Sequence, residues 1–408
     1  MTNDTKHIPS GYKPSPLGPI PENWEVKRLG DFSRFFSGGT PKSGNPLFYN
    51  GDIPFIRSGE INKDKTELFL SQKGVDNSSA KLVEKGDILY ALYGANSGQC
   101  SLSKIQGAIN QAILCIRPKA NKYYVMSVLQ LNKEHYYNSF LQGGQGNLSG
   151  EIVSNYRLAI PPIKEQERIC AVLQLWDTAI AKQTALIEKL TLRKRGLMQQ
   201  LLTGKKRLEG FSGEWNYHRI EEHFEQVVDR NDGKGHLPMT ISAKLGLVSQ
   251  KDKFDRVVAG NSLDNYTLLK KGDFAYNKGN SNLYEMGCIY RLAEESAVVP
   301  FVYICFRAKD DTSCEFYQHF FINHGLDKQL KQIITSGARG DGLLNVNSND
   351  FMSLRIPYPP IKEQLAIADI LNNADKEIEI QKQKLTAMQE QKKGLMQVLL
   401  TGKKRIKR

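Results

Sequence analysis

The sequence predicts an α+β protein in which two globular α/β domains are separated by two long helices that form an antiparallel coiled coil. Three observations predict this fold: a long internal repeat, an unbroken helical spacing of apolar residues within the repeat, and similar landmarks in the two stretches that precede its copies. At 408 residues the chain also exceeds a typical single domain. The fold is therefore expected to be a pseudo-two-fold internal duplication.

The repeat comprises residues 161–207 and 359–405, which align without a gap at an offset of 198 with 23 of 47 positions identical. Both copies begin Pro-Pro-Ile-Lys-Glu-Gln and end Leu-Leu-Thr-Gly-Lys-Lys-Arg. A proline pair fits the first turn of a helix, and Gly204 and Gly402 suit a left-handed stop at its end. Each copy is therefore predicted to be one long helix.

Within each copy, steps of four and three residues alternate without interruption, giving the period of 3.5 that is typical of a coiled coil. This seam consists of Ile169, Leu173, Trp176, Ile180, Gln183, Ile187, Leu190, Lys194, Leu197 and Leu201 in the first helix, and of Ile367, Leu371, Ala374, Ile378, Gln381, Leu385, Met388, Lys392, Leu395 and Leu399 in the second. Each seam spans roughly 48 Å at 1.5 Å per residue.

Full antiparallel overlap would place Trp176 opposite Lys392 and Lys194 opposite Ala374. The lysine stem could then pack on the indole while its ammonium reaches solvent. The alternative is that the two stripes are ordinary helix cores of separate domains.

The stretches that precede the two helices have similar size and landmarks. Each begins near a tryptophan (Trp24 or Trp215), and each contains a Lys-Gly-Asp turn, at 85–87 or 271–273, that feeds a strand. A buried strand, an amphipathic helix, a glycine-rich loop and a last strand are expected to follow in both. The predicted segments are 1–160 and 211–358 as domains, and 161–210 and 359–408 as helices.

Composition indicates an anionic partner and a cytosolic protein. The net charge is +13, with +5 in residues 1–160, +5 in 161–210 and +5 in 359–408. Residues 211–358 carry 17 Lys and Arg against 19 Asp and Glu, so this domain needs basic groups on one face or help from its neighbours. No apolar run is long enough to span a membrane, and the N-terminus lacks a signal-peptide core. The six cysteines show no metal-like spacing, which predicts buried, reduced thiols.

Candidate readers of nucleic-acid sequence are loop side chains that carry donors and acceptors beside glycines. The alternative for each is a solvated turn residue. The candidates are Arg57, Ser58, Tyr93, Asn96, Ser97, Gln99, Gln145 and Asn147 in the first domain, and Lys278, Asn280, Ser281, Asn282, Tyr284 and Arg339 in the second.

Catalytic signatures are missing from the sequence. There is no phosphate-binding P-loop, no dinucleotide fingerprint, no GxSxG, and no Asn/Asp-Pro-Pro-Tyr/Phe motif of amino-methyltransferases. The pairs His218/His223 and His319/His324 are five residues apart, which on a helix would place them on different faces and argues against a metal site. We therefore expect no catalytic residue, cofactor or metal in this chain, and expect catalysis to come from a partner.

The Ile-Pro-Pro-Ile-Lys-Glu-Gln start at 160–166, its copy at 359–364 and the duplicated Leu-Leu-Thr-Gly-Lys-Lys-Arg endings resemble the specificity subunits of type I restriction-modification systems, over nearly the whole chain. This resemblance implies two target recognition domains, each reading one half of a split, asymmetric site in double-stranded DNA. It also implies that the helices set the spacing and dock two methyltransferase subunits that use S-adenosylmethionine. Restriction subunits that use ATP and Mg²⁺ are a further expected partner.

If the helices act as a ruler, a matched four-residue insertion near Lys189 and Ala387 is expected to lengthen the DNA spacer. Two other classes remain open at this stage. One is a coiled-coil scaffold that binds only proteins, and the other is a self-contained DNA-modifying enzyme, which would bind S-adenosylmethionine or a divalent metal by itself.

Overall fold

The structure is a computed structural model that describes residues 8–140, 148–243, 245–254, 260–279, 284–309, 312–334 and 344–406. It confirms the α+β class and contains two compact units. The first unit combines residues 1–184 with 383–408, and the second is residues 185–382. Each unit thus includes half of both long helices, so the compact units cross the four segments expected from the sequence. The assignment of 1–160 and 211–358 as target recognition domains stays a prediction.

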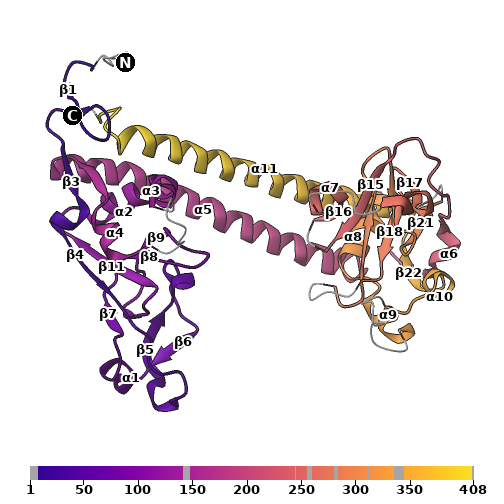
Figure 1. Cartoon of the computed structure of the whole chain (residues 1–408). Coiled ribbons are helices and arrows are strands. Elements are labelled where there is room, and N and C mark those ends of the chain that lie inside the picture. The colour runs from indigo at the N-terminus through magenta and orange to yellow at the C-terminus, as the bar shows by residue number, and fades with distance from the viewer. Residues whose placement is uncertain are drawn as a thin grey trace. The chain divides into compact units, whose positions relative to one another are not determined.

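In the first unit, a mixed set of short strands and helices precedes the first long helix (Figure 1). The elements are β1 (Tyr12–Lys13), β2 (Ile20–Pro21), β3 (Glu25–Arg28), η1 (Leu29–Phe32), β4 (Ser33–Ser37), η2 (Pro46–Phe48), β5 (Tyr49–Ile56), η3 (Ser58–Glu60), β6 (Leu68–Leu70), α1 (Gln72–Asp76), β7 (Lys81–Val83), β8 (Ile88–Ala91), β9 (Cys100–Leu102), β10 (Gly107–Ile109), β11 (Ile113–Pro118), α2 (Lys122–Leu131), α3 (Lys133–Phe140), α4 (Gly150–Ser154), β12 (Arg157–Ile160) and α5 (Ile163–Leu201).

The second unit repeats this order. Its elements are β13 (Asn216–Arg219), α6 (Ile220–His223), β14 (Phe224–Gln226), β15 (Leu237–Ser242), β16 (Gly246–Ser249), α7 (Gln250–Phe254), η5 (Gly260–Asn265), β17 (Thr267–Lys270), β18 (Phe274–Asn277), β19 (Cys288–Arg291), β20 (Ser296–Val299), β21 (Ile304–Ala308), α8 (Cys314–Ile322), α9 (Asp327–Ile333), α10 (Ser348–Met352), β22 (Arg355–Tyr358) and α11 (Ile361–Leu399).

The sheets of the two units share one topology. The order β6-β5-β10-β7 in the first unit matches β16-β15-β20-β17 in the second, and β4-β11-β8-β9 matches β14-β21-β18-β19. In both units the pairing of the second and third strands of the first sheet is parallel, while the other pairings in these sheets are antiparallel. A two-stranded sheet, β12-β3 or β13-β22, leads each unit into its long helix. The internal duplication therefore extends through the globular parts, where the sequences have diverged.

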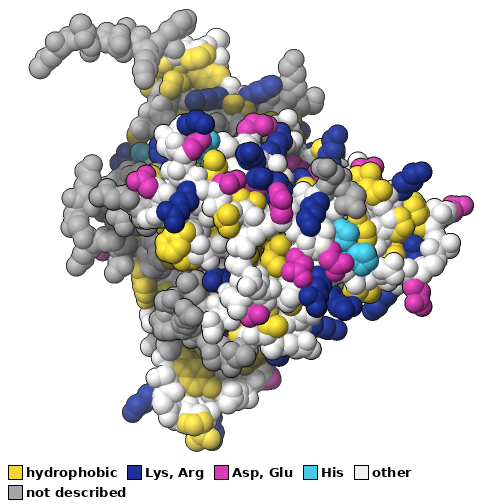
Figure 2. Space-filling view, turned by 90° about the vertical axis from the view of Figure 1, so that its right-hand side faces the viewer, with side chains coloured by type: hydrophobic (Ala, Val, Ile, Leu, Met, Phe, Trp, Pro, Cys, Tyr) yellow, Lys and Arg dark blue, Asp and Glu magenta, His cyan; other side chains and the backbone are white. Residues whose placement is uncertain are grey.

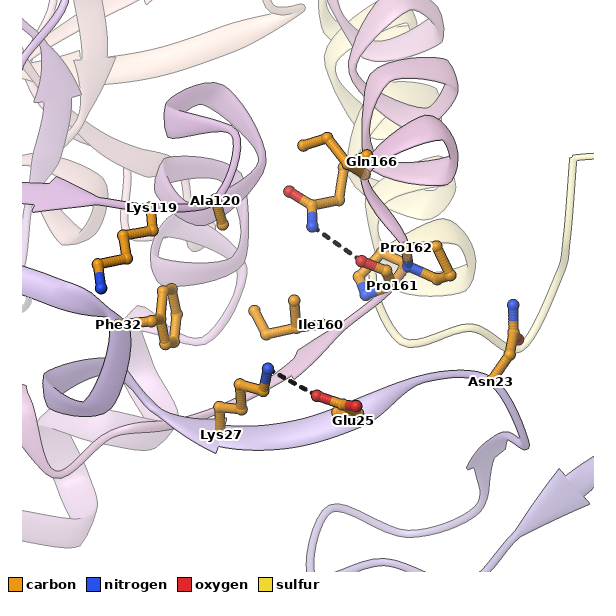
Figure 3. Close-up of a pocket in the computed structure, with 11 residues that line it drawn as sticks. Asn23, Glu25, Lys27, Phe32, Lys119, Ala120, Ile160, Pro161, Pro162 and Gln166 are labelled. Carbon is orange, nitrogen blue, oxygen red and sulfur yellow. Dashed lines mark hydrogen bonds and ion pairs between the residues drawn. The ribbon is translucent and has the colours of Figure 1, made fainter.

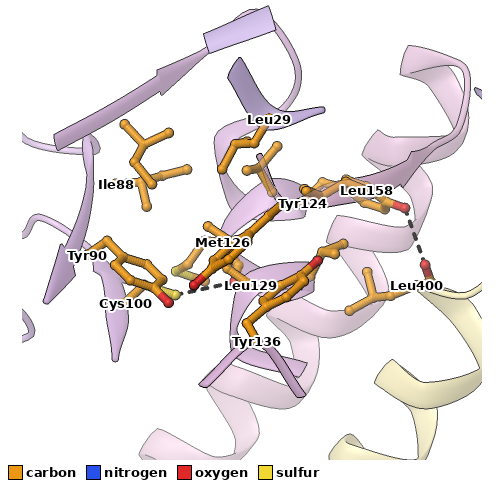
Figure 4. Close-up of a cluster of buried hydrophobic side chains, with 14 of the residues drawn as sticks. Leu29, Ile88, Tyr90, Cys100, Tyr124, Met126, Leu129, Tyr136, Leu158 and Leu400 are labelled. Atoms are coloured by element: carbon orange, nitrogen blue, oxygen red, sulfur yellow. Dashed lines mark hydrogen bonds between the residues drawn. The ribbon is translucent and has the colours of Figure 1, made fainter. Parts of the chain in front are cut away.

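Each unit has a core that includes the start of one long helix and the end of the other. In the first unit, Tyr124, Leu158 and Leu400 pack together (Figure 4). The Tyr124 hydroxyl donates to the carbonyl of Ala159 at 2.8 Å. In the second unit, Tyr317 takes the same place and donates to the carbonyl of Pro357 at 2.9 Å. Burial of such large apolar side chains is the main term that stabilises each unit.

Every residue of the predicted seam in α5 and α11 is buried or half-buried. Two ion pairs set the antiparallel register: Lys392 binds Asp177 in the first unit, and Lys194 binds Asp375 at 2.5 Å in the second. Asp177 follows Trp176 and Asp375 follows Ala374, which is the predicted register. The Lys392 ammonium pairs with Asp177 instead of extending freely into solvent, because a carboxylate on the next residue is within reach.

A duplicated cluster fixes the helix ends. In the first unit, Glu165 accepts hydrogen bonds from Arg405 (2.8 and 2.7 Å) and from the Trp24 indole (3.2 Å). In the second unit, Glu363 accepts them from Arg207 (2.7 Å each) and Trp215 (3.0 Å). We call these the two Glu-Arg-Trp clusters. Each joins the start of one long helix to the residues that follow the other.

The glutamine after each of these glutamates is also duplicated in its contacts. Gln166 donates to the carbonyl of Pro161 at 2.8 Å and accepts from the amide of Asn121 at 2.9 Å. Gln364 donates to the carbonyl of Pro359 at 2.8 Å and accepts from the amide of Ser313 at 3.0 Å.

Within the described residues, no helix is both long enough and apolar enough to cross a membrane.

Candidate nucleic-acid interface

Six of the predicted readers lie in two equivalent connections: Tyr93, Asn96, Ser97 and Gln99 between β8 and β9, and Lys278 and Tyr284 between β18 and β19. We call these two connections, 92–99 and 278–287, the reader loops. Leu148, which follows the first glycine-rich stretch, donates from its amide to the carbonyl of Leu92 at 2.9 Å. Leu344, which follows the second, donates to the carbonyl of Lys278 at 2.9 Å. In both units the chain therefore returns from its glycine-rich stretch to the base of the reader loop.

The first reader loop is a tight turn whose side chains have different roles. Gly94 and Gly98 have φ of +81° and +77°, which only glycine adopts readily. Ser97 is buried, and its hydroxyl donates to the carbonyl of Leu92 at 3.0 Å, so it shapes the turn. Gln99 is exposed, while Tyr93 and Asn96 are half-buried. Of the predicted readers in this loop, Gln99, Tyr93 and Asn96 are therefore the ones available to a ligand.

Arg57 and Ser58 lie beside this loop. A Cβ placed on Gly59 would be 3.7 Å from Nδ2 of Asn96, so the turn after β5 adjoins the reader loop. The Arg57 guanidinium binds Glu60 and Glu67, and these hydrogen bonds raise the pKa of Arg57. Because Arg57 binds the buried Glu60, it stabilises its own turn. It is also a candidate reader. Ser58 is half-buried.

In the second unit, Lys278 and Tyr284 belong to a network that holds the reader loop. The Lys278 ammonium donates to the carbonyl of Val346 at 3.3 Å. The hydroxyls of Tyr284 and Tyr290 lie 3.1 Å apart. The ring of Tyr284 stacks on that of His324, with the ring centroids 4.7 Å apart. Sequence reasoning missed Tyr290 and His324, because only the fold brings them to the loop.

Six candidates, all on or beside the glycine-rich stretches or the second reader loop, lie outside the described residues and stay predictions. They are Gln145, Asn147, Asn280, Ser281, Asn282 and Arg339.

Charges of both signs are mixed on the surface. The face in Figure 2 shows Lys and Arg side chains interspersed with Asp and Glu. Several basic residues of the second unit are held in ion pairs, among them Arg291 with Glu315 at 2.5 Å and Arg307 with Asp273 at 2.7 Å. Because such paired cations contribute little net field, the second unit alone is a weak attractor of phosphate.

Two expectations about histidine and cysteine have different outcomes. The inference that a spacing of five separates His218 from His223 is wrong, because they lie on β13 and α6, with Nδ1 of His218 2.6 Å from Nε2 of His223. Even so, the described residues contain no group of three or more side chains suited to a metal ion. All six cysteines are free, and burial raises the pKa of Cys100, Cys115, Cys170 and Cys305 to about 12.

Comparison with known proteins identifies the family. The model of the family described as type I restriction modification DNA specificity domain matches residues 21–192 and 249–390. The chain belongs to this family. The two matches fall one on each half of the specificity subunit, as the duplicated topology does.

Curated relatives align with nearly the whole chain or with part of it. The specificity subunit of the type I restriction enzyme MjaVIII from Methanocaldococcus jannaschii is 24% identical over 418 aligned residues, covering 95% of this chain and 94% of that protein. The EcoR124I/EcoR124II specificity subunit of Escherichia coli is 25% identical over 165 residues, 38% of this chain and 41% of that protein.

Two solved structures share the fold. The type I S subunit from M. genitalium gives a TM-score of 0.54 at 14% identity, covering 93% of this chain and 96% of that one. A chain from a study of complex assembly and conformational transition of the type I R-M system gives a TM-score of 0.59 at 14% identity, covering 94% and 99%. The family and the fold predicted from the sequence are thus confirmed.

Proposed function

We propose that this specificity subunit reads a bipartite DNA site, with each unit recognising one half. The observation that carries the proposal is the double match to the DNA specificity domain, combined with one strand order that places a reader loop at the same point of each unit. Both halves therefore present the same scaffold with different side chains.

The chemistry of the two loops supports an asymmetric target. The first loop presents Tyr93, Asn96 and Gln99, whereas the second begins with Lys278 and includes Tyr284. Amide side chains match adenine edges, and lysine matches the acceptors of guanine. Different half-sites are the expected consequence.

The subunit itself is proposed to be non-catalytic and cytosolic. Methyltransferase subunits would supply adenine methylation with S-adenosylmethionine, and restriction subunits would add ATP- and Mg²⁺-dependent functions. Apolar side chains exposed away from the seam, such as Leu175 (71% exposed) and Ile380 (51%), support protein docking on the long helices.

The long helices are proposed to set the half-site spacing. The observed register refines the test, because Lys189 faces the region of Glu379 and not that of Ala387. Seven residues inserted after both Lys189 and Glu379 keep the seam in phase and add about 10.5 Å, or about three base pairs. The expected result is a spacer longer by about that amount, and an unchanged spacer would refute the ruler. Insertion into α5 alone is the control and should only disturb the pairing.

The primary test is a genome-wide map of N6-methyladenine in the host with and without this gene. Loss of one split, asymmetric motif on deletion is the expected result. An unchanged map, in cells that express the methyltransferase, would contradict the proposal.

A further inference from the structure

Two hollows lie side by side at the start of α5 in the first unit. One, of about 400 Å³, is lined by Phe32, Ala120 and Ile160, with Lys27 and Lys119 at its edge (Figure 3). The other, of about 450 Å³, is lined by basic side chains. Both include Asn23 and Pro162 among their walls, so the two hollows adjoin, and we call them together the α5-start pocket.

The basic part of the α5-start pocket carries available positive charge. Lys164, Arg168 and Arg405 line it together with Glu165. Arg405 is neutralised by its two hydrogen bonds to Glu165. Lys164 and Arg168 are exposed, and neither makes an ion pair within the described residues. This half of the pocket therefore fits carboxylates.

The second unit shows what fills the apolar half. By strand register and topology, Lys27, Phe32 and Ile160 correspond to His218, His223 and Tyr358. There the rings stack face to face, with centroids 3.5 Å apart for His223 and Tyr358 and 4.9 Å for His218 and Tyr358. Where the second unit uses the ring of its own Tyr358, the first unit has the shorter Ile160 and open space.

The basic half differs between the units in the same way. At the repeat offset of 198, Arg168 corresponds to Ala366, while Lys164 corresponds to Lys362. The first unit thus combines open space beside Ile160 with an additional cation, whereas the second unit has Tyr358 and Ala366 at the corresponding positions.

We propose that the α5-start pocket binds an acidic segment of the methyltransferase subunit that inserts one aromatic side chain against Phe32 and Ile160. The identity of this partner rests on the proposed function. Carboxylates flanking the ring bind Lys164 and Arg168, and the exposed Ile163 (52%) adds apolar contact at the rim. The two units consequently hold their partners unequally, the first more tightly.

A protein fits this surface better than DNA. The carboxylates in the walls are already paired, Glu25 with Lys27 at 2.6 Å and Glu165 with Arg405, so they do not cancel the charge of Lys164 and Arg168. No residue predicted to read DNA lines either hollow. Aromatic anchors seated in a pocket and surrounded by complementary charge are typical of protein interfaces.

The test measures the affinity of the purified methyltransferase subunit for full-length variants by calorimetry. Ile160→Tyr fills the pocket as Tyr358 does, and Arg168→Ala copies the second unit. Each is expected to weaken the tighter site about tenfold, which corresponds to about 1.4 kcal/mol. Lys164→Ala is also expected to weaken the tighter site. Its matched control is Lys362→Ala in the second unit, beside Ala366, which should leave the tighter site unchanged.

Arg168 is an exposed residue, so its variant tests the proposal even where Ile160→Tyr lowers stability. An unchanged affinity for Arg168→Ala overturns it, as does a loss of DNA affinity with methyltransferase binding intact. Failure of the unmodified chain to bind the methyltransferase would instead contradict the proposed function. A photo-crosslinking benzoylphenylalanine at Ile163 should capture a partner segment rich in Asp and Glu with an aromatic residue, and capture of a basic segment would refute the assignment.

Discussion

The two Glu-Arg-Trp clusters have the same sequence but different environments, and this difference makes a quantitative prediction. Glu363 is fully buried and its partner Arg207 is 18% exposed, whereas Glu165 is 13% exposed and Arg405 is 43% exposed. Removing one member of a buried ion pair leaves an uncompensated charge and costs about 3–5 kcal/mol, while exposed pairs contribute about 0–1 kcal/mol. Replacing Glu by Gln keeps the shape and one acceptor but removes the charge.

We therefore expect Glu363→Gln to destabilise the second unit by about 3 kcal/mol and Glu165→Gln to destabilise the first by about 1 kcal/mol. Hydrogen exchange measured by mass spectrometry suits this question, because it reports local opening in each unit separately. The comparison uses peptides from the first turns of α11 and α5. Equal losses of protection, or a larger loss for Glu165→Gln, would show that burial does not control the strength of this cluster.

Three further predictions concern stability, reactivity and pairing. Burial raises the pKa of Asp87, but hydrogen bonds from Arg117 and Lys122 outweigh it, so that the pKa is about 2; the depressed value stabilises the fold above pH 4 by about 2 kcal/mol, and this is lost as pH falls toward 2. Denaturation at pH 5 and pH 3 should show a loss of stability that is about 1 kcal/mol larger in the unmodified chain than in Asp87→Asn. Iodoacetamide at pH 7.4 should modify the buried cysteines only after unfolding, with the half-buried Cys314 reacting first; rapid native labelling of Cys115 would contradict its burial. Cysteine pairs placed along the seam should crosslink at 176 with 392 and at 194 with 374, and crosslinks between parallel positions would overturn the register.

The long helices could be predicted from the sequence because their information is local. A spacing of 3.5 residues, a proline pair and a terminal glycine define a helix and its seam without any knowledge of distant residues. The seam then leaves few antiparallel registers, and Asp177 with Lys392 confirms the expected one. The family resemblance depended on the same duplicated residues.

The sequence predicts loops between the paired strands of each unit, but it does not predict the contacts that individual side chains make there. Arg57 forms an ion pair with Glu67, ten residues along the chain. The ring of Tyr284 stacks on that of His324, which is 40 residues away in the sequence. His218 and His223 touch because a strand ends between them, whereas the prediction assumed a helix. Contacts of this kind depend on where strands turn, which local patterns in the sequence do not specify.

The contrast between identical helix ends and divergent loops follows from what each residue contacts. Glu165 must satisfy Trp24 and Arg405 together, and Gln166 must satisfy Pro161 and Asn121, so a change at either position breaks contacts between separate elements. Gln99 in the reader loop is exposed, and substitution there leaves the scaffold intact. The same logic applies to Ile160 and Arg168, which lie next to the Glu-Arg-Trp cluster but outside its hydrogen bonds. These two positions could differ between the units without loss of the fold, and this freedom allows one duplicated architecture to hold two partners unequally.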